Sequence, residues 1–438
     1  MQLLPLVFFF LLLTSFFQLS SQSFRPVASI NRDGQTSLYI VNLFAPIPWG
    51  FDAEASKHFV VDINAPFSWY MCWEDNDPYR PPFACTSQEC NQGRTYLSPM
   101  CQSTNNTLVN GQCYCSVTPT NPVTNACASS LLTHMDLNVP WTGTGHHVSG
   151  HLSFSDVCIS CAPGSLWQLP NNVSLPDYVA GLASLSWSPL SLATQFTPAY
   201  LGVGRKFAIC LPGEAEGSGV LFFGDGPYYL MQFRADIRRL LSYTPLIRRD
   251  NISVEYYIGV EKILIQGEPL KMKHGTFDFD GKGNGGVMLS TVVPYTILRS
   301  DIYHAFLKKF SKATHGYPIV HKKIHPFGLC FNTTQHRPTR VGLPFPRVDL
   351  ALRNGTNWRM FGANSMKEVR KGVACLAFVD GGKTAKQAVV IGSHQLEDNF
   401  LQFDLDSSRL GFSSSLLAHG TNCGNFNFTS DAPDFPWG

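Results

Sequence analysis

The same local pattern occurs once in each half of the chain, and this repetition constrains the fold more than any other feature. In the first half an apolar run ends at Asp62, in His58-Phe-Val-Val-Asp62, and in the second half a run ends at Ser290, in Gly285-Gly-Val-Met-Leu-Ser290. A short apolar run that stops at a turn residue is typical of a buried β-strand. Two such halves would normally bring two carboxylates together to activate one water molecule, but Ser290 carries a hydroxyl. The sequence therefore predicts an enzyme scaffold without its full chemistry.

The remaining sequence predicts short strands rather than long helices. Only 15% of the 438 residues are charged, and the chain is rich in Gly (36) and Pro (29), which suits strands joined by many turns. Strand-like runs bounded by turn residues occupy residues 36–42, 207–211, 219–223, 256–260, 262–265 and 388–391. The length suffices for two domains. We predict a mostly β protein with an N-terminal lobe at 23–230, a C-terminal lobe at 231–438 and a few short helices.

One segment, residues 300–310, shows convincing helical periodicity. Its apolar residues recur at intervals of four and share one face, formed by Ile302, Phe306 and Phe310. Ser300 or Asp301 is expected to cap the first turn, because a short polar side chain can accept a hydrogen bond from the free backbone N–H groups there.

The first residues, 1–22, read as a secretory signal peptide. An apolar stretch too short for a membrane span is followed by small polar residues, and cleavage is expected near Ser20 to Ser23. No second run of about 18 apolar residues follows. The net charge of +2 gives no reason to expect nucleic acid or an anionic membrane as a partner. We therefore expect a soluble secreted protein.

The thirteen cysteines of such a chain indicate a disulfide framework with one thiol left over. Seven crowd between Cys72 and Cys127, an insertion expected to depend on bridges for its shape. Cys158 and Cys161 have the spacing of a redox motif, but structural bridges are favoured because no helix signal follows them. No nucleotide-binding or zinc-finger motif occurs, so neither a cofactor nor a metal is expected. Six sequons are candidate glycosylation sites: Asn105, Asn172, Asn251, Asn332, Asn354 and Asn427.

Several motifs together match one protein family. They occupy residues 285–295, 326–330, 362–366, 390–400, 402–406, 409–412 and 423–428. Over essentially the whole mature chain the sequence resembles the pepsin-like aspartic proteases of plants. Within them it is similar to the secreted group of TAXI-type xylanase inhibitors, extracellular dermal glycoprotein, basic 7S globulins and glucanase-inhibitor proteins. The resemblance implies two β-rich lobes with a central cleft. It also implies that Cys158 is the unpaired cysteine, because related chains usually have a single cysteine in that stretch.

The resemblance identifies Asp62 and Ser290 as the two dyad positions of an aspartic protease. Such an enzyme needs two carboxylates that share a proton, each in an Asp-Thr/Ser-Gly loop. Here Asn64 and Val292 stand where the loop glycines belong, and no flap motif with a tyrosine occurs around residues 127–134. We therefore expect negligible peptidase activity. Asp62 would then be kept for structure, and the Ser290 hydroxyl would be satisfied within its turn.

The resemblance also points to two surface residues as inhibitory contacts. His419 lies four residues before the last cysteine, as does the histidine that TAXI-type inhibitors insert between the catalytic carboxylates of a xylanase. Arg340 stands where those inhibitors carry a leucine and extracellular dermal glycoproteins carry an arginine. This difference shifts the expected target toward another class, such as xyloglucan-specific endoglucanases. An exposed loop histidine without a role is the alternative interpretation of His419.

Three functions follow from these observations. The favoured hypothesis is an inactive protease homologue of the apoplast or cell wall that inhibits microbial glycoside hydrolases, either xylanases or xyloglucan endoglucanases. The first alternative is a storage or binding protein of the basic 7S globulin type. The second is a secreted aspartic endopeptidase with residual activity. The sequence leaves the oligomeric state open.

Overall fold

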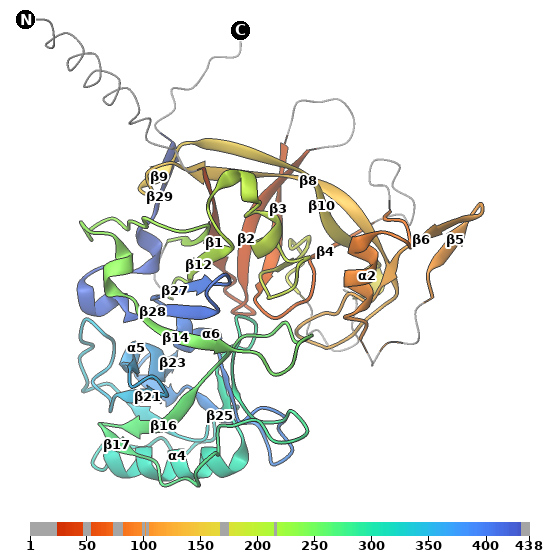
Figure 1. Cartoon of the computed structure of the whole chain (residues 1–438). Helices are drawn as coiled ribbons and strands as arrows, with labels where there is room; N and C mark the ends of the chain where they lie inside the picture. Colours follow the sequence, from red (N-terminus) through yellow and green to blue (C-terminus); the bar gives the residue numbers. More distant parts are fainter. Residues whose placement is uncertain are drawn as a thin grey trace, which may run out of the picture.

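Two β-rich lobes, one above the other in Figure 1, make up the protein in a computed structural model. The structure describes residues 24–46, 54–72, 82–98, 101, 105–166, 175–213 and 217–430. The expected signal peptide at 1–22 and the sequon at Asn172 lie outside these residues. Within them most elements are short strands, which confirms the predicted mostly β, bilobal architecture. No helix of the described part is long and apolar enough to cross a membrane.

The first half of the chain forms the upper lobe (Figure 1). Its strands are β1 (Arg25–Arg32), β2 (Tyr39–Pro46), β3 (Glu54–Asp62), β4 (Trp69–Met71), β5 (Thr107–Val109), β6 (Gln112–Tyr114), β7 (Ser116–Val117), β8 (Ser130–Thr142), β9 (His147–Val148), β10 (Gly150–Ala162), β11 (Gly181–Ser184), β12 (Lys206–Cys210) and β13 (Gly219–Phe223). Its helices are α2 (Gln88–Arg94) and α3 (Leu192–Gln195), with the 3-10 turns η1 (Gly164–Leu166) and η2 (Ala199–Leu201).

The second half contributes the lower lobe and also returns to the upper one. Its strands are β14 (Ser242–Ile247), β15 (Tyr257–Ile258), β16 (Val260–Ile265), β17 (Glu268–Pro269), β18 (Val287–Leu289), β19 (Thr296–Leu298), β20 (Cys330–Asn332), β21 (Val348–Leu352), β22 (Asn357–Met360), β23 (Met366–Arg370), β24 (Val373–Leu376), β25 (Phe378–Asp380), β26 (Val389–Ile391), β27 (Asn399–Asp404), β28 (Arg409–Ser415) and β29 (Asn427–Ser430). Its helices are α4 (Ser300–Ala313), α5 (Gly362–Ser365) and α6 (Ser393–Leu396), with η3 (Ile237–Leu240), η4 (Leu416–His419) and η5 (Cys423–Asn425). Each strand expected from the sequence has a counterpart here.

The two halves share one strand arrangement around the two dyad positions. In the first half β3 runs parallel to β11, with Asp62 opposite Ser184, and β11 pairs antiparallel with β4. In the second half β18 runs parallel to β26, with Leu289 opposite Ile391, and β26 pairs antiparallel with β19. Asp62 and Ser290 therefore stand at corresponding strand ends, and the repeated sequence pattern marks a repeated structure.

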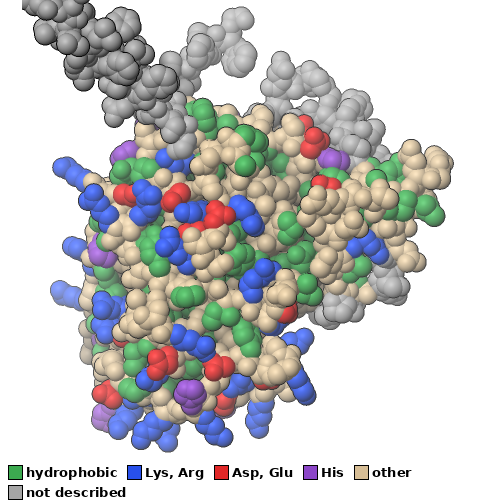
Figure 2. All heavy atoms as spheres, viewed as in Figure 1, with side chains coloured by type: hydrophobic (Ala, Val, Ile, Leu, Met, Phe, Trp, Pro, Cys, Tyr) green, Lys and Arg blue, Asp and Glu red, His purple; other side chains and the backbone are tan. Residues whose placement is uncertain are grey.

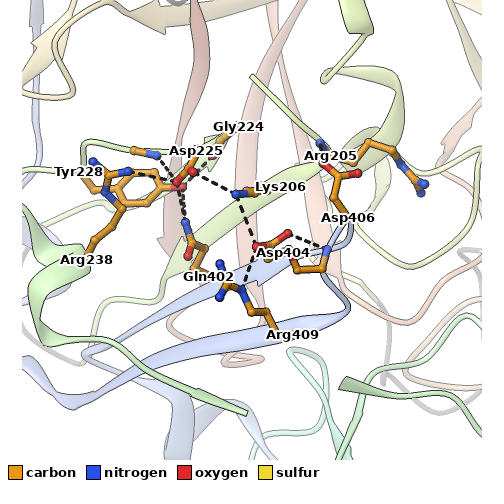
Figure 3. A network of polar contacts seen from close by, with 12 residues as sticks. Arg205, Lys206, Gly224, Asp225, Tyr228, Arg238, Gln402, Asp404, Asp406 and Arg409 are labelled. Carbon is orange, nitrogen blue, oxygen red and sulfur yellow. Dashed lines mark hydrogen bonds and ion pairs between the residues drawn. The ribbon is translucent and has the colours of Figure 1, made fainter. Parts of the chain in front are cut away.

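A six-stranded antiparallel sheet joins the two halves in the order β1-β13-β12-β27-β28-β14. A network of charges crosses this sheet (Figure 3). Lys206 Nζ lies 3.0 Å from Asp225 Oδ2 and 3.4 Å from Asp404 Oδ2, while Arg409 Nε donates to Asp404 at 3.0 Å. Burial acts to raise the pKa of Asp404, but the hydrogen bonds from Ser407 and Arg409 and the charge of Lys206 outweigh it and lower that pKa. The buried carboxylate thus stays charged and ties β27 to β12.

Helix α4 has the predicted apolar face but not the predicted cap. Ile302, Phe306 and Phe310 are all buried. The residue at the N-cap is Arg299, without a capping side-chain bond. The expectation that Ser300 or Asp301 caps the helix is wrong because both side chains have other partners. Ser300 Oγ donates to Asp380 at 2.6 Å, and Asp301 accepts from Arg299 Nε at 2.8 Å.

The cysteines form six disulfides, and Cys158 is the free one, as the resemblance implied. The bridges are Cys72–Cys161, Cys85–Cys113, Cys90–Cys115, Cys101–Cys127, Cys210–Cys423 and Cys330–Cys375. Cys161 is therefore bridged, and it forms no redox pair with Cys158. Burial, with a contribution from the charge of Glu89, raises the pKa of the Cys158 thiol, so this thiol stays protonated. Helix α2 inside the cysteine-rich insertion was not predicted.

Candidate functional site

The turn after β3 holds Asp62 in a buried position. The residue is 7% exposed, and its Oδ1 accepts a hydrogen bond from the backbone N–H of Asn64 at 2.7 Å. Burial raises the pKa of Asp62 to about 6, although hydrogen bonds from the N–H groups of Asn64 and Ala65 oppose the rise and the charge of Glu255 adds to it. A single acid in this state can exchange a proton with water, but paired acid–base catalysis needs a second carboxylate at the opposite position.

Ser290 does not supply that second group. Its Oγ accepts hydrogen bonds from the backbone N–H groups of Val292 at 3.3 Å and Val293 at 3.1 Å, so the hydroxyl closes its own turn. Among the described residues, no histidine forms a hydrogen bond with this hydroxyl. The arrangement has the form of a local side-chain-to-backbone turn, and a serine without a base beside it is a weak nucleophile.

The two turns are fastened to each other across the boundary between the halves. Thr291 Oγ1 donates to the carbonyl of Val61 at 2.7 Å, and Asn64 Nδ2 donates to the carbonyl of Leu289 at 2.8 Å. In the sequence, Asn64 stands where the family has a loop glycine. In the structure its amide instead forms one of the bonds that hold the halves together, a role that the local sequence does not reveal.

The segment expected to lack a flap motif, residues 127–134, leads into a long paired strand. From Ser130 onward it belongs to β8, which pairs antiparallel with β7 and β10. Thr133 Oγ1 also donates to the carbonyl of Ile159 on β10 at 3.0 Å. The backbone from Ser130 onward is therefore part of the sheet.

A second candidate site brings together the two residues proposed as inhibitory contacts. His419 and Arg340 are both exposed. Arg340 NH1 lies 3.8 Å from the position that a Cβ on Gly420 would occupy, which places the guanidinium beside the residue that follows His419. The His419 ring is also edge-on to Phe233, with ring centroids 6.4 Å apart. Phe233 and the adjoining Met231, which is 53% exposed, add apolar surface that the sequence did not indicate.

The loop that carries Arg340 is braced on both sides of the arginine. The backbone groups of Thr339 and Gly342 exchange hydrogen bonds at 2.8 and 3.1 Å, which makes a tight turn with Arg340 at its tip. Gly342 has a φ of +89°, and a Cβ there would lie 2.2 Å from the backbone nitrogen of Ala363. Ala363 N–H donates to the carbonyl of Val341 at 2.9 Å. The turn is therefore clamped against α5.

The loop that carries His419 is braced as well. Gly420 follows η4 in the left-handed conformation, with a φ of +75°. Thr421 Oγ1 donates to the carbonyl of Met231 at 3.0 Å, and Cys423 is bonded to Cys210 of β12. Leu416, at the start of η4, is fully buried. Rigid support of this kind reduces the entropy lost when a surface loop binds a partner.

The sequons within the described residues lie at the surface or near it. Four of them are exposed, namely Asn105, Asn251, Asn332 and Asn354, whereas Asn427 is half-buried in β29. An exposed asparagine amide is a precondition for glycosylation.

Comparison with known proteins places the chain in one family. The xylanase inhibitor N-terminal domain matches residues 53–225, and the xylanase inhibitor C-terminal domain matches residues 255–414. Gamma conglutin 1 of Prunus dulcis is 37% identical over 406 residues, which cover 92% of this chain and 89% of that protein. The probable aspartic proteinase GIP2 of Nicotiana benthamiana is 35% identical over 445 residues, or 96% and 97% of the two chains.

A solved structure agrees with these matches. The crystal structure of EDGP superimposes with a TM-score of 0.82 at 32% identity, covering 93% of this chain and 98% of that one. The matched domains and the relatives span nearly the whole sequence, and the strand arrangement repeats in both lobes. The chain therefore belongs to the xylanase-inhibitor-like family, whose members have a bilobal pepsin-like fold.

Proposed function

We propose that this protein is a secreted, catalytically inactive protease homologue that inhibits microbial cell-wall-degrading glycoside hydrolases. The observation that carries the proposal is the adjacency of His419 and Arg340 on two exposed, braced loops. Both matched domains take their name from xylanase inhibition. The matched C-terminal domain ends at residue 414, so the role of His419 rests on the geometry of its loop.

The chemistry of a glycosidase cleft suits this pair of side chains. A retaining glycosidase holds two carboxyl groups about 5 Å apart, one of them protonated. A charged imidazole can donate from both ring nitrogens, and a guanidinium donates in a fixed fork to a carboxylate. Hydrogen bonds between such charged groups gain strength when the cleft excludes water. His419 is therefore proposed to enter the catalytic gap, with Arg340 binding an acidic group at its rim.

The test is inhibition of a panel of fungal xylanases and xyloglucan-specific endoglucanases by purified protein. For the inhibited enzyme, His419→Ala is expected to weaken binding about 30-fold or more, and Arg340→Ala about tenfold, as for residues at the centre of an interface. His321→Ala, an exposed histidine on another loop, serves as the matched control and is expected to change nothing. The proposal fails if no enzyme is inhibited, or if the control weakens inhibition as much as His419→Ala.

The same proposal requires the site formed by Asp62 and Ser290 to be inactive. We expect no cleavage of denatured protein between about pH 3 and 5, the range in which paired carboxylates of aspartic proteases work. A transition-state analogue of aspartic proteases is accordingly expected to have no effect. Cleavage that this analogue blocks and that Asp62→Asn abolishes would show instead that Asp62 has found a catalytic partner.

A second candidate function, a storage or binding protein of the basic 7S globulin type, is favoured by one observation. Of the six disulfides, Cys210–Cys423 joins the two halves of the chain. A cut between the lobes would therefore leave two chains linked by this bond. Two fragments that separate on a gel only after reduction, in protein from its natural source, would favour this function.

A further inference from the structure

Charge is distributed unevenly along the chain, although the total is close to zero. Residues 231–430 contain 26 lysines and arginines against 15 aspartates and glutamates, a net charge of +11, whereas the whole chain carries +2. Figure 2 shows Lys and Arg side chains along the lower edge of the molecule, where Figure 1 places α4 and β17. The whole-chain value therefore conceals a basic surface on the lower lobe.

A half-open cavity of about 560 Å³ lies in this basic region, between β16, β17 and the segment that follows. Buried apolar side chains, among them Leu270 and Phe277, line part of its wall, and Lys271, Lys273 and His274 line another part. Other charges at the cavity are already neutralised. Glu261 pairs with Lys262 at 2.9 Å, and Asp278 pairs with Arg353. The two remaining lysines, Lys271 and Lys273, form no ion pair with any other described residue.

Helix α4 continues the basic surface beside this cavity. Lys309 Nζ donates to the carbonyl of Pro269 on β17 at 3.1 Å and pairs with Glu268 at 4.0 Å, which fixes the helix next to the cavity edge. Lys308 and Lys312 are exposed and lie one turn apart, at a Cβ separation of about 6 Å. We call the set Lys271, Lys273, Lys308 and Lys312 the lower basic surface.

The composition of this surface distinguishes between classes of polyanion. Single-stranded nucleic acid is held by exposed aromatic side chains on which bases stack. The exposed aromatic residues of the described chain, Phe24, Tyr178 and Tyr200, all belong to the other half. All four cations are lysines, which attract anionic groups as hydrated point charges without the bidentate geometry that arginine imposes. The cavity is large enough to hold part of a small ligand such as one or two sugar rings.

We propose that the lower basic surface binds a linear acidic polysaccharide that carries a carboxylate on each sugar ring. One ring occupies the cavity beside Lys271 and Lys273, and the chain continues along α4 past Lys308 and Lys312. This binding is separate from glycosidase inhibition, since His419 and Arg340 belong to other loops. It would hold the protein on a charged polymer while the inhibitory loops stay free.

The test is the affinity of the full-length protein for polygalacturonate, measured by titration calorimetry, with fully methyl-esterified polygalacturonate as the uncharged comparison. Binding to the charged polymer is expected to weaken steeply as salt rises from about 50 to about 200 mM. The pair of substitutions Lys271→Glu/Lys273→Glu is expected to weaken it at least about tenfold. Arg370→Glu/Lys371→Glu makes the same charge change on the exposed turn of a different sheet, β20-β24-β23, and is expected to stay within about twofold.

Several results would overturn the proposal. They are failure to bind polygalacturonate, equal binding of the esterified polymer, equal losses in the two charge-reversed variants, and tighter binding of single-stranded nucleic acid of the same charge. Glycosidase inhibition is measured on the same samples and is expected to be unchanged in Lys271→Glu/Lys273→Glu. Failure of the proposed inhibitory function is thereby distinguishable from failure of the polysaccharide site.

Discussion

Replacing both Cys210 and Cys423 by alanine is expected to lower the free energy of unfolding by about 5 kcal/mol, because their disulfide closes a loop of 213 residues. The bond also lies in an apolar cluster with Phe222, Leu416 and Phe426, which packs the end of the chain against β12 and β13. Denaturant unfolding of both proteins, with fluorescence as the signal, measures the difference. Since His419 lies four residues from Cys423, the variant is also expected to inhibit glycosidases less well.

The matched control is the disulfide Cys85–Cys113, which closes a loop of 28 residues in the upper lobe and encloses neither His419 nor Arg340. Its removal is expected to cost about 4 kcal/mol by the same loop-entropy argument and to leave inhibition unchanged. The comparison therefore separates a general loss of stability from a specific loss of the tail's anchor. If both variants inhibit the target enzyme equally well, the disulfide at Cys423 does not position His419.

The sequence predicted the fold because its signals are local and repeated. The apolar runs before Asp62 and Ser290 each became a short strand in the same arrangement, β3 with β11 and β18 with β26. Helix α4 was found from its apolar spacing, but its cap was not, since the choice of partner for Ser300 depends on Asp380, far along the chain. Helix α2 was missed because cysteine and polar residues dominate its segment, so that no apolar periodicity marks it, although Ser87 caps its start.

The sites were predicted less completely, because they depend on contacts between distant segments. His419 and Arg340 were each proposed separately, and their adjacency follows from two braces, the Cys210–Cys423 bond and the clamp of Gly342 against Ala363. The crossing bond of Asn64 needs a partner from the other half of the chain, and the apolar surface at Phe233 meets His419 from nearly 200 residues further along the same half. The net charge of the whole chain did not reveal the lower basic surface, because it is the sum of a basic half and an acidic half.

Buried acids are expected to make the protein less stable as the pH rises from 4 to 7. Burial raises the pKa of Asp62 and of Asp398 from the ordinary 3.8 to about 6 in each case. Below the ordinary value both folded and unfolded chains hold these protons. Between the two values the folded chain keeps protons that the unfolded chain releases, so stability decreases as pH rises through 6. Each group accounts for up to about 3 kcal/mol at neutral pH.

Asparagine substitution tests this directly, because an amide keeps the acceptor oxygen without the charge. Asp62→Asn and Asp398→Asn are expected to raise the free energy of unfolding at pH 7 by up to about 3 kcal/mol each and to have little effect at pH 4. Denaturant unfolding at pH 4 and at pH 7 should therefore show the gain in the free energy of unfolding only at pH 7. Asp62 Oδ1 accepts from the Asn64 N–H, and Asp398 Oδ1 accepts from the Cys423 N–H at 3.0 Å, so both hydrogen bonds survive the change.

Asp404→Asn provides a control in which the free energy of unfolding at pH 7 is expected to change in the opposite direction. The pKa of Asp404 is lowered by its hydrogen bonds and by its cations, so its contribution to stability is present above the ordinary pKa and is lost as the pH falls through the lowered folded value. Its replacement is expected to destabilise the protein at pH 7, because Lys206 and Arg409 lose a buried partner. If Asp62→Asn lowers the free energy of unfolding equally at pH 4 and pH 7, Asp62 is retained for hydrogen bonds that an amide cannot reproduce. A gain confined to pH 7 would instead show that the charge of Asp62 destabilises the folded protein.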